Sequence, residues 1–264
     1  MEYRCLKVEK RGGVATVTFH RPDKGNMLSM EMMNEIINLT EEFQDDVDTR
    51  AVLFTGAGKS FCMGVDLNDP EHISTAEGPL LARQRKFSIG PRMIRALYSM
   101  NQITIAALNG VAQGGGACIA SAMDFRVGAD NCSVAYPEVN IALPLSWVSL
   151  PLCVHLVGPS RAKRLVMLGK REKAETLLNW GFLDDVVPAD SLPEHAGKMA
   201  EEYAAQAPIP IQMTKRSINA IVSYLDNAVM HMDTDQVLLA QSTGDFEEGI
   251  KAVFEKRKPE FKGE

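Results

Sequence analysis

The sequence predicts an α/β fold with a largely parallel sheet, followed by a helical C-terminal region. Two observations support this class. Short apolar segments with strand character alternate with helical patterns over about residues 1–190, as expected for parallel strands joined by helical crossovers. Residues 191–264 then show helical patterns only. We therefore expect a core unit over residues 1–190 and a helical region over residues 191–264.

The first predicted elements are a hairpin and a helix. Val14–Phe19 alternates in polarity and predicts a strand, and Gly12-Gly13 predicts the turn after a first strand that ends near Val8. After a loop, Ser29 is a suitable N-cap for a helix. The apolar residues expected on one face of that helix are Met33, Ile36, Ile37, Phe43 and Val47.

The central segments predict more strands and two glycine-rich connections. Ala51–Thr55 and Ile103–Leu108 are short and apolar, so both predict buried strands. A glycine-rich loop over 56–68 and a helical stretch over 80–100 separate them. A run of three glycines opens a small-residue helix over 114–123. Further strands are expected at Phe125–Ala129 and Ser133–Tyr136.

The last segments are mostly helical. Ser160 is expected to cap a helix that runs to Leu168, and Gly181 lies where a following helix should end. Residues 192–250 predict successive helices, interrupted by Pro208 and Pro210.

Composition and charge exclude several classes of protein. Hydrophobic residues make up 45% and charged residues 23% of the chain, which are globular values and exclude a disordered chain. The net charge of −6 argues against nucleic-acid binding. Residues 139–160 lack charged side chains except His155, but three prolines interrupt them. That segment predicts a broken helix or pocket wall, and no membrane span.

Cysteine usage and the N-terminus indicate the compartment. The five cysteines are an odd number without C-x-x-C spacing, which favours a reducing environment. The first residues lack the apolar run of a secretory signal. We therefore expect a cytoplasmic location.

Common cofactor and nucleophile motifs are absent or incomplete. Thr55–Ser60 resembles a phosphate loop, but Leu53 stands where the pattern needs glycine, and Phe61 breaks the dinucleotide fingerprint. No histidine pair has metal-ligand spacing and no G-x-S-x-G elbow occurs. We expect neither a metal nor a separate cofactor.

Two loops and one acid carry the chemical signal. The loops follow the strands that end at Thr55 and Leu108, so both lie at the same edge of a parallel sheet. The run Gly114-Gly-Gly116 at a helix start leaves N–H groups free for an anionic oxygen. Spacing alone favours the simpler interpretation that both loops are tight packing turns.

Glu138 is the one acid in a long apolar neighbourhood. A carboxylate that loses solvent there has a raised pKa and can serve as a general base. A solvent-facing glutamate at a strand exit is the alternative.

Several segments together resemble the crotonase, or enoyl-CoA hydratase/isomerase, superfamily. The segments that carry the resemblance, in chain order, are Arg21-Pro-Asp-Lys-Gly-Asn-Met-Leu28, Ser60-Phe-Cys-Met-Gly-Val-Asp-Leu67, Ala107-Leu-Asn-Gly-Val-Ala-Gln-Gly-Gly-Gly116, Tyr136-Pro-Glu138, Val157-Gly-Pro-Ser-Arg-Ala162 and Trp180-Gly-Phe-Leu-Asp-Asp-Val-Val-Pro188. Each motif is loose alone, but their shared order is specific, and it covers nearly the whole chain.

The resemblance implies a fold, a substrate class and an assembly. The fold is a spiral of repeated ββα units with C-terminal helices that build homotrimers, often paired into homohexamers. The substrate is an acyl-CoA thioester of fatty-acid metabolism, so coenzyme A is part of the substrate. The N–H groups of Val65 and Gly115 would hold the thioester oxygen and stabilise an enolate. The residues expected to contact substrate are Met63, Gly64, Asp66, Leu67, Asn68, Gly114, Cys118 and Trp147.

One departure from the family pattern favours a particular reaction. Similar hydratases place a first glutamate where this chain has Cys118, so only Glu138 remains. A lone carboxylate suits a Δ3,Δ2-enoyl-CoA isomerase, in which Glu138 moves a proton from C2 to C4. The alternatives are a 2-enoyl-CoA hydratase, which is a lyase, or decarboxylation or thioester hydrolysis on the same fold. A non-enzymatic RNA-binding or scaffold protein is a further alternative, which the net charge disfavours.

Overall fold

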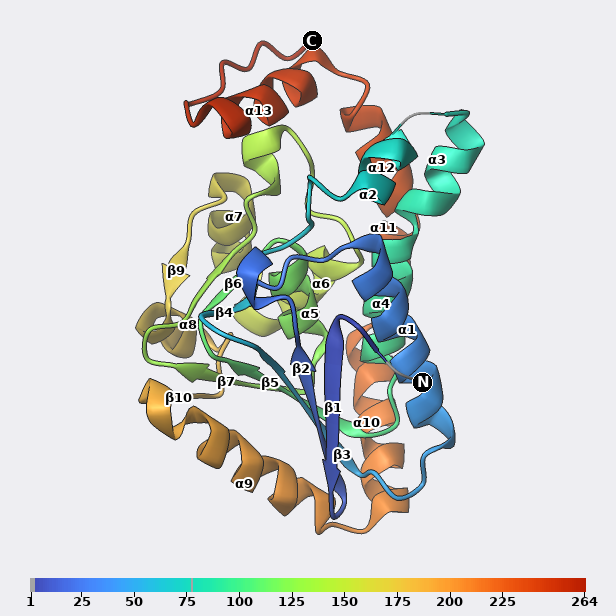
Figure 1. Cartoon of the computed structure of the whole chain (residues 1–264), viewed down its shortest axis with the longest axis vertical. Coiled ribbons are helices and arrows are strands. Elements are labelled where there is room, and N and C mark those ends of the chain that lie inside the picture. The colour runs from blue at the N-terminus through green and yellow to red at the C-terminus, as the bar shows by residue number, and fades with distance from the viewer. Residues whose placement is uncertain (1–2, 77) are drawn as a thin grey trace.

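Two sheets organise the chain. The computed structural model describes residues 3–76 and 78–264 (Figure 1), and within them the strands form one sheet of six and one of four. Helices fill the connections and make up the whole C-terminal part. The expected α/β class with C-terminal helices is confirmed.

The larger sheet is parallel apart from its first strand. Only β1 runs antiparallel, as the first arm of a hairpin with β2, and the remaining neighbours pair in parallel. Its strands, in the order in which they pair, are β1 (Leu6–Arg11), β2 (Val14–Phe19), β3 (Ala51–Gly56), β5 (Ile103–Leu108), β7 (Phe125–Ala129) and β10 (Asp185–Val187).

The smaller sheet consists of strands that directly follow those of the larger one. Its order is β4 (Ser60–Cys62), β6 (Val111–Gln113), β8 (Ser133–Ala135) and β9 (Glu172–Lys173). The chain thus passes from β3 to β4, from β5 to β6 and from β7 to β8, and helices connect these pairs into a spiral of ββα turns. Glycine is needed where successive turns meet, since a Cβ on Gly110 would lie 2.0 Å from the Lys59 carbonyl oxygen.

The helices follow each strand pair and then continue alone. They are α1 (Met30–Asp45), α2 (Pro70–Ala76), α3 (Leu80–Phe87), α4 (Ile89–Tyr98), α5 (Gly115–Ala122), α6 (Ser149–Val157), α7 (Pro159–Leu168), α8 (Ala174–Trp180), α9 (Leu192–Ala204), α10 (Pro208–Val222), α11 (Asn227–Met230), α12 (Asp233–Ala240) and α13 (Gly244–Glu255). Short 3-10 helices occupy Pro22–Lys24, Glu138–Ile141 and Ala189–Ser191.

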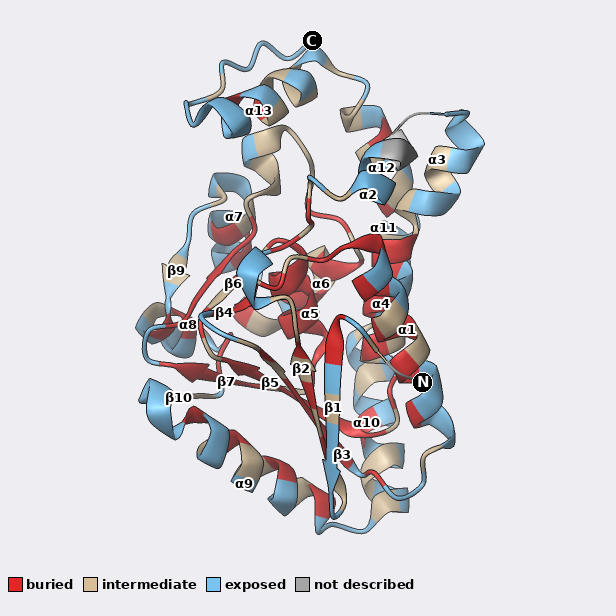
Figure 2. Cartoon of the chain, viewed as in Figure 1, coloured by how far each residue is buried: buried red, intermediate tan, exposed pale blue. Residues whose placement is uncertain are grey.

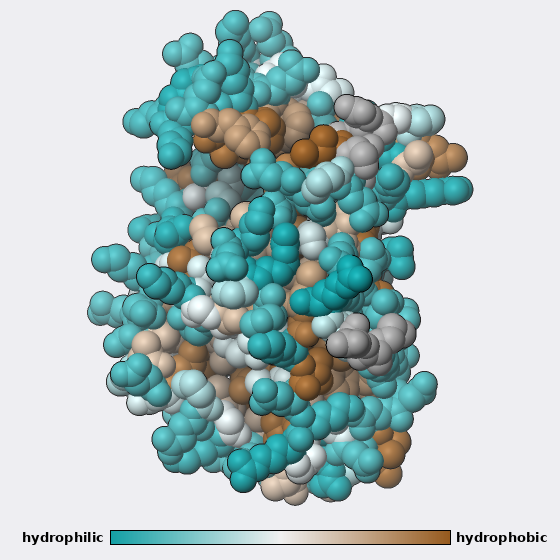
Figure 3. All heavy atoms as spheres, viewed as in Figure 1, coloured by the Kyte–Doolittle hydropathy of each residue, from teal (hydrophilic) through white to brown (hydrophobic). Residues whose placement is uncertain are grey.

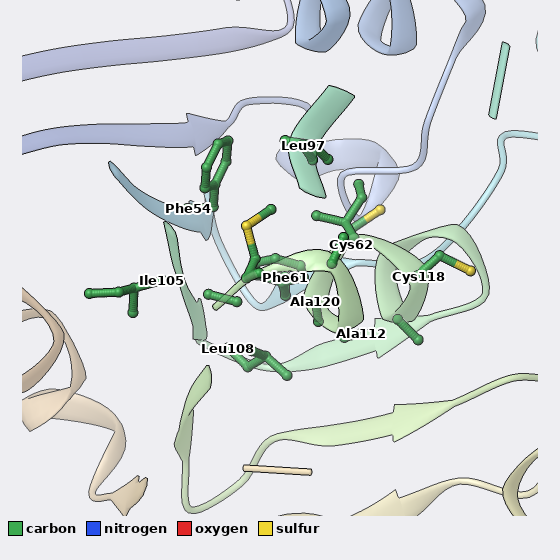
Figure 4. Close-up of a cluster of buried hydrophobic side chains, with 14 of the residues drawn as sticks. Phe54, Phe61, Cys62, Leu97, Ile105, Leu108, Ala112, Cys118 and Ala120 are labelled. Carbon is green, nitrogen blue, oxygen red and sulfur yellow. The ribbon is translucent and has the colours of Figure 1, made fainter. Parts of the chain in front are cut away.

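Helix α5 lies at the centre of the core. All of its residues are buried, and Figure 2 shows it enclosed by other buried elements. Its side chains, including Cys118 and Ala120, lie among Phe61 and Cys62 from β4 and Ala112 from β6 (Figure 4). Because the small residues of α5 allow this close packing, the glycine-rich start of the helix is rigidly held.

The C-terminal helices attach to the rest of the chain at several places. Figure 1 shows α9 running beneath the larger sheet, and it contacts β2, β3, β5 and β7. Helix α10 is fixed by the buried Lys215, whose Nζ lies 2.6 Å from an Asp124 carboxylate oxygen and donates to the Gln102 carbonyl oxygen at 2.7 Å. Helices α12 and α13 then return to earlier elements, where α12 contacts α3 and α13 contacts the 3-10 helix at Glu138.

Most predicted elements are confirmed, including the N-cap at Ser29, whose Oγ accepts the Met32 N–H, and the helix end at Gly181. Two details are wrong. Val47 is 86% exposed and lies beyond α1, because the Asp46 carboxylate accepts the Asp48 and Thr49 N–H groups and ends the helix. Ser160 is not a cap.

Helix α7 starts one residue before Ser160. Its N-cap is Gly158, at φ 76°, and Pro159 takes the first helical position, where a missing N–H costs nothing. For the same reason Pro208 begins α10, which confirms the expected break between helices there, whereas Pro210 lies inside the first turn of α10.

Candidate active site

The first loop of the site is the segment after β4. Gly64 has φ 93° and Val65 forms a bridge with Leu28. Leu28 donates its N–H to the Gly64 carbonyl oxygen at 2.8 Å, and Asp66 donates to the Leu28 carbonyl oxygen at 2.9 Å. These bonds leave the Val65 N–H between them on the other side of the strand, and no hydrogen bond within the described residues uses it.

A buried ion pair fixes that loop from behind. The Arg21 guanidinium lies 2.9 Å from an Asp66 carboxylate oxygen and also donates to the Met27 carbonyl oxygen. The fully buried Asn26 donates to the carbonyl oxygens of Ala57 and Ser60. Since both ends of the segment 21–28 are held, the Val65 N–H has a fixed direction.

The second loop is the glycine run at the start of α5. Gly114 adopts φ 52° and donates its N–H to the Ala135 carbonyl oxygen at 2.9 Å. Gly115 occupies the first helical position, where the N–H has no intrahelical partner. Gly116 lies against β4, since a Cβ there would be 2.1 Å from the Cys62 carbonyl oxygen. The loop therefore combines tight packing with a free N–H.

The two loops and Glu138 meet within a few ångströms. A Cβ built on Gly64 would lie 3.7 Å from the Gly115 nitrogen, and one built on Gly114 would lie 3.2 Å from Glu138 Oε1. The Cβ position on Gly114 is also 3.8 Å from the Gly64 Cα. The structure thus brings together the two free N–H groups and the carboxylate that the sequence singled out.

Glu138 is shielded from solvent at one carboxylate oxygen. Its Oε2 is buried and has no hydrogen-bond partner among the described residues. Desolvation raises the pKa of Glu138 from 4.5 to about 7, against a smaller opposing effect of its own backbone N–H. A carboxylate with this pKa can both accept and return a proton near neutral pH.

These groups border a cavity of about 350 Å³ with mostly apolar walls. Among the predicted site residues, Met63, Gly64, Val65, Leu67, Gly114, Gly115, Cys118, Glu138 and Trp147 line it. The walls also include Met30 and Met33 from α1, Phe87 from α3, and Phe246, Ile250 and Val253 from α13. Figure 3 shows apolar side chains at the surface near α13, at the upper end of the view.

Two predicted contact residues lie outside the cavity wall. Asp66 is 2% exposed and its carboxylate faces Arg21. Asn68 donates its N–H to an Asp66 carboxylate oxygen at 3.2 Å and is likewise absent from the lining. Asp66 therefore supports the loop from behind, and substrate contact by Asn68, which is exposed, stays a prediction.

Cys118 remains a neutral thiol in this site. Burial, and secondly the charge of Glu138, raise the pKa of Cys118 well above its usual value. The thiol therefore contributes a small apolar surface beside the carboxylate. Among the described residues, no group of three or more histidines, cysteines, aspartates or glutamates could hold a metal ion.

The sequence did not indicate the walls from α12 and α13. Asp233, Thr234 and Val237 come from α12, and they reach the cavity only through the return of the C-terminal helices. No local pattern in the sequence marks such a long-range contact. Among the described residues, no helix is long and apolar enough to cross a membrane.

Comparisons with known proteins agree with the fold. A model of the family "Enoyl-CoA hydratase/isomerase" matches residues 9–264. The short-chain-enoyl-CoA hydratase of Clostridium acetobutylicum is 32% identical over 262 residues, which cover 98% of each chain. The 1,2-epoxyphenylacetyl-CoA isomerase of Escherichia coli is 30% identical over 263 residues, which cover 100% of this chain and 99% of that one.

A solved structure supports the same assignment. The crystal structure of carnitinyl-CoA hydratase from Mycobacterium avium superimposes with a TM-score of 0.85 at 30% identity, and the match covers 100% of both chains. The agreement extends from the ββα spiral to the C-terminal helices. The chain therefore belongs to the enoyl-CoA hydratase/isomerase family, and the protein is an enzyme of the crotonase superfamily.

Proposed function

We propose that the protein is a Δ3,Δ2-enoyl-CoA isomerase in which Glu138 is the single proton shuttle. The observation that carries this proposal is the carboxylate of Glu138 beside two unused N–H groups in one cavity. Cys118 lines the same cavity and stands where similar hydratases have a first glutamate. The similar proteins include one named as a hydratase and one named as an isomerase, so they do not favour either reaction. The proposal therefore rests on the site.

The reaction follows from the arrangement. The thioester oxygen of a 3-enoyl-CoA accepts hydrogen bonds from the N–H groups of Val65 and Gly115, and the Glu138 carboxylate removes a proton from C2. The resulting dienolate places its charge on the thioester oxygen, where each preset donor can contribute about 3–4 kcal/mol. Glu138 then returns the proton at C4. The double bond now joins C2 and C3 and is conjugated with the thioester.

The apolar walls favour isomerisation over addition of water. Met63 and Trp147 border the same cavity as Glu138, and exclusion of water strengthens the interactions with the enolate. Hydration is best served by two carboxylates that hold one water molecule. In this chain Cys118 stands where similar hydratases have the second carboxylate.

The experiment is a comparison of the enzyme with its Glu138→Gln variant on a 3-enoyl-CoA. Conjugated 2-enoyl-CoA is followed by its absorbance, and we expect the variant to lose about 100-fold or more in kcat. Undiminished turnover by the variant would remove Glu138 from the mechanism. Gln at this position keeps the shape of the side chain, so the comparison isolates the proton.

One observation favours a 2-enoyl-CoA hydratase as the second candidate. Asp233 is another carboxylate in the cavity lining, and one of its oxygens accepts the Val148 N–H. Its other oxygen could hold a water molecule. Rapid formation of 3-hydroxyacyl-CoA from crotonyl-CoA, with little isomerisation of a 3-enoyl-CoA, would support the hydratase.

Assembly into a homotrimer or homohexamer is part of the same proposal. Support comes from α10 and the turn after it, which expose large apolar side chains: Ile209, Met213, Ile218, Ile221, Tyr224 and Leu225. Sedimentation analysis would test this, and a monomer at micromolar concentration would contradict it. A cytoplasmic location is supported by the five cysteines, all of which are free.

A further inference from the structure

A strained turn forms one wall of the cavity. Trp147 and Val148 have φ values of 58° and 53°, in the left-handed region. A β-branched residue such as valine is rarely found there, because its side chain crowds the backbone. Val148 is 1% exposed, so its N–H cannot obtain a hydrogen bond from bulk water. A turn of this kind persists only where its surroundings hold it.

The turn determines where the Trp147 ring lies. A Cβ on Gly90 would be 2.1 Å from Trp147 Cε2, and one on Gly115 would be 2.7 Å from Trp147 Cζ3. The ring therefore fits between two glycine backbones, one in α4 and one at the proposed oxyanion site. Trp147 also lines the cavity, so a change at the turn would move the wall and the space beside Gly115.

Asp233 supplies the bond that holds this turn. Its Oδ2 accepts the Val148 N–H, across 85 residues of sequence. The residue lies at the start of α12, is 6% exposed and lines the cavity. Arg95 from α4 stabilises the charge of this buried carboxylate, although desolvation raises its pKa overall. Within the described residues, no other side chain bonds to the Val148 backbone.

We propose that Asp233 is a positioning residue that fixes Trp147 as the cavity wall beside Gly115, so that helix α12 influences the size of the acyl group that binds. This inference rests on the proposed function in one respect, namely that the cavity holds the acyl chain of a CoA thioester. Asp233 acts through Val148 and Trp147, and it needs no contact with the reacting carbons.

The fluorescence of Trp147 allows a test without turnover. The chain has two tryptophans, Trp147 and Trp180, and Trp180 lies outside the cavity beside Arg164. In a Trp180→Phe background, the emission and acrylamide quenching of Trp147 report its packing. Asp233→Asn keeps an oxygen that can accept the Val148 N–H, and Asp233→Leu has a similar size without an acceptor.

The expected results separate the two variants. We expect Asp233→Leu to increase the quenching of Trp147 and to change the ratio of the dissociation constants of butanoyl-CoA and dodecanoyl-CoA by about fivefold or more, as for loss of one buried hydrogen bond. Asp233→Asn should keep both properties within about twofold. Adding Val148→Gly to the leucine variant should restore much of the wild-type quenching, because glycine accepts the left-handed conformation.

Any of three outcomes would overturn the inference: unchanged quenching in Asp233→Leu, an unchanged chain-length ratio in Asp233→Leu, or an Asp233→Asn variant as disturbed as Asp233→Leu. If the leucine variant does not fold, Asp233→Ala takes its place in the same comparison. The quenching measurement needs no substrate, so it decides whether Asp233 positions Trp147 even if the wild-type protein binds no acyl-CoA. Failure of the wild-type protein to bind acyl-CoA would contradict the proposed function alone.

Discussion

Replacing Glu138 by glutamine should make the protein more stable at alkaline pH and have little effect at acidic pH. The carboxylate has lost its hydration on one oxygen and gains no partner there. The ionised form is therefore less favourable in the folded protein than in the unfolded chain. Glutamine removes this cost because it carries no charge at any pH.

The size and sign of the effect follow from the pKa. Burial raises the pKa of Glu138 from 4.5 to about 7, which corresponds to about 3 kcal/mol because a tenfold change in protonation is about 1.4 kcal/mol. The pKa of Glu138 is higher in the folded protein than in the unfolded chain. Its contribution to the free energy of unfolding is therefore fully present below about pH 4.5, where the side chain is protonated in both states, and is lost as the pH rises toward and through about 7.

The assay is urea denaturation of both proteins from about pH 5 to about pH 9, with the difference in unfolding free energy plotted against pH. Taking the difference removes the contributions of all other titrating groups. We expect the glutamine variant to gain about 2–3 kcal/mol relative to wild type over this range, with most of the gain between about pH 5 and about pH 7 and a plateau above that. A difference that stays constant with pH would refute the claim that Glu138 is desolvated.

Three further predictions concern neighbouring residues. Cys118→Glu should raise the hydration of crotonyl-CoA by about tenfold or more, since it supplies a second carboxylate; no gain in 3-hydroxyacyl-CoA would contradict this. Gly115→Ala should lower kcat by about tenfold or more, because its Cβ would lie 2.7 Å from the Trp147 ring and displace the N–H; unchanged kcat would count against the oxyanion role. Asp66→Asn should cost about 1–3 kcal/mol in urea denaturation and reduce kcat more than it raises KM, because Arg21 loses its partner; an effect on KM alone would instead indicate substrate contact.

The parts of the site that the sequence predicted are those encoded within single segments. The glycine run at Gly114 and the acid at Glu138 each follow a strand, and parallel strands bring their ends to one edge. The order of the family motifs then made the combination specific. The roles of these residues remain predictions, whereas their proximity is a property of the structure.

The parts that could not be predicted depend on contacts between distant segments. Asp66 looked like a cavity residue by its place in the loop, but its partner Arg21 lies 45 residues away and turns the carboxylate backward. Asp233 reaches the cavity only because α12 returns to the core. The strain at Val148 likewise depends on this contact, and valine itself gives no sign of a left-handed conformation.

Transfer of isotope within the substrate is the most direct test of a single proton shuttle. A 3-enoyl-CoA with both C2 hydrogens replaced by deuterium is converted in ordinary water, and the product is examined by NMR after less than one turnover per site. We predict that part of the deuterium lost from C2 appears at C4, because the shielded Glu138 carboxyl group returns it before exchange with solvent. A product whose new hydrogen at C4 comes entirely from solvent would contradict the direct return of the proton by a shielded Glu138.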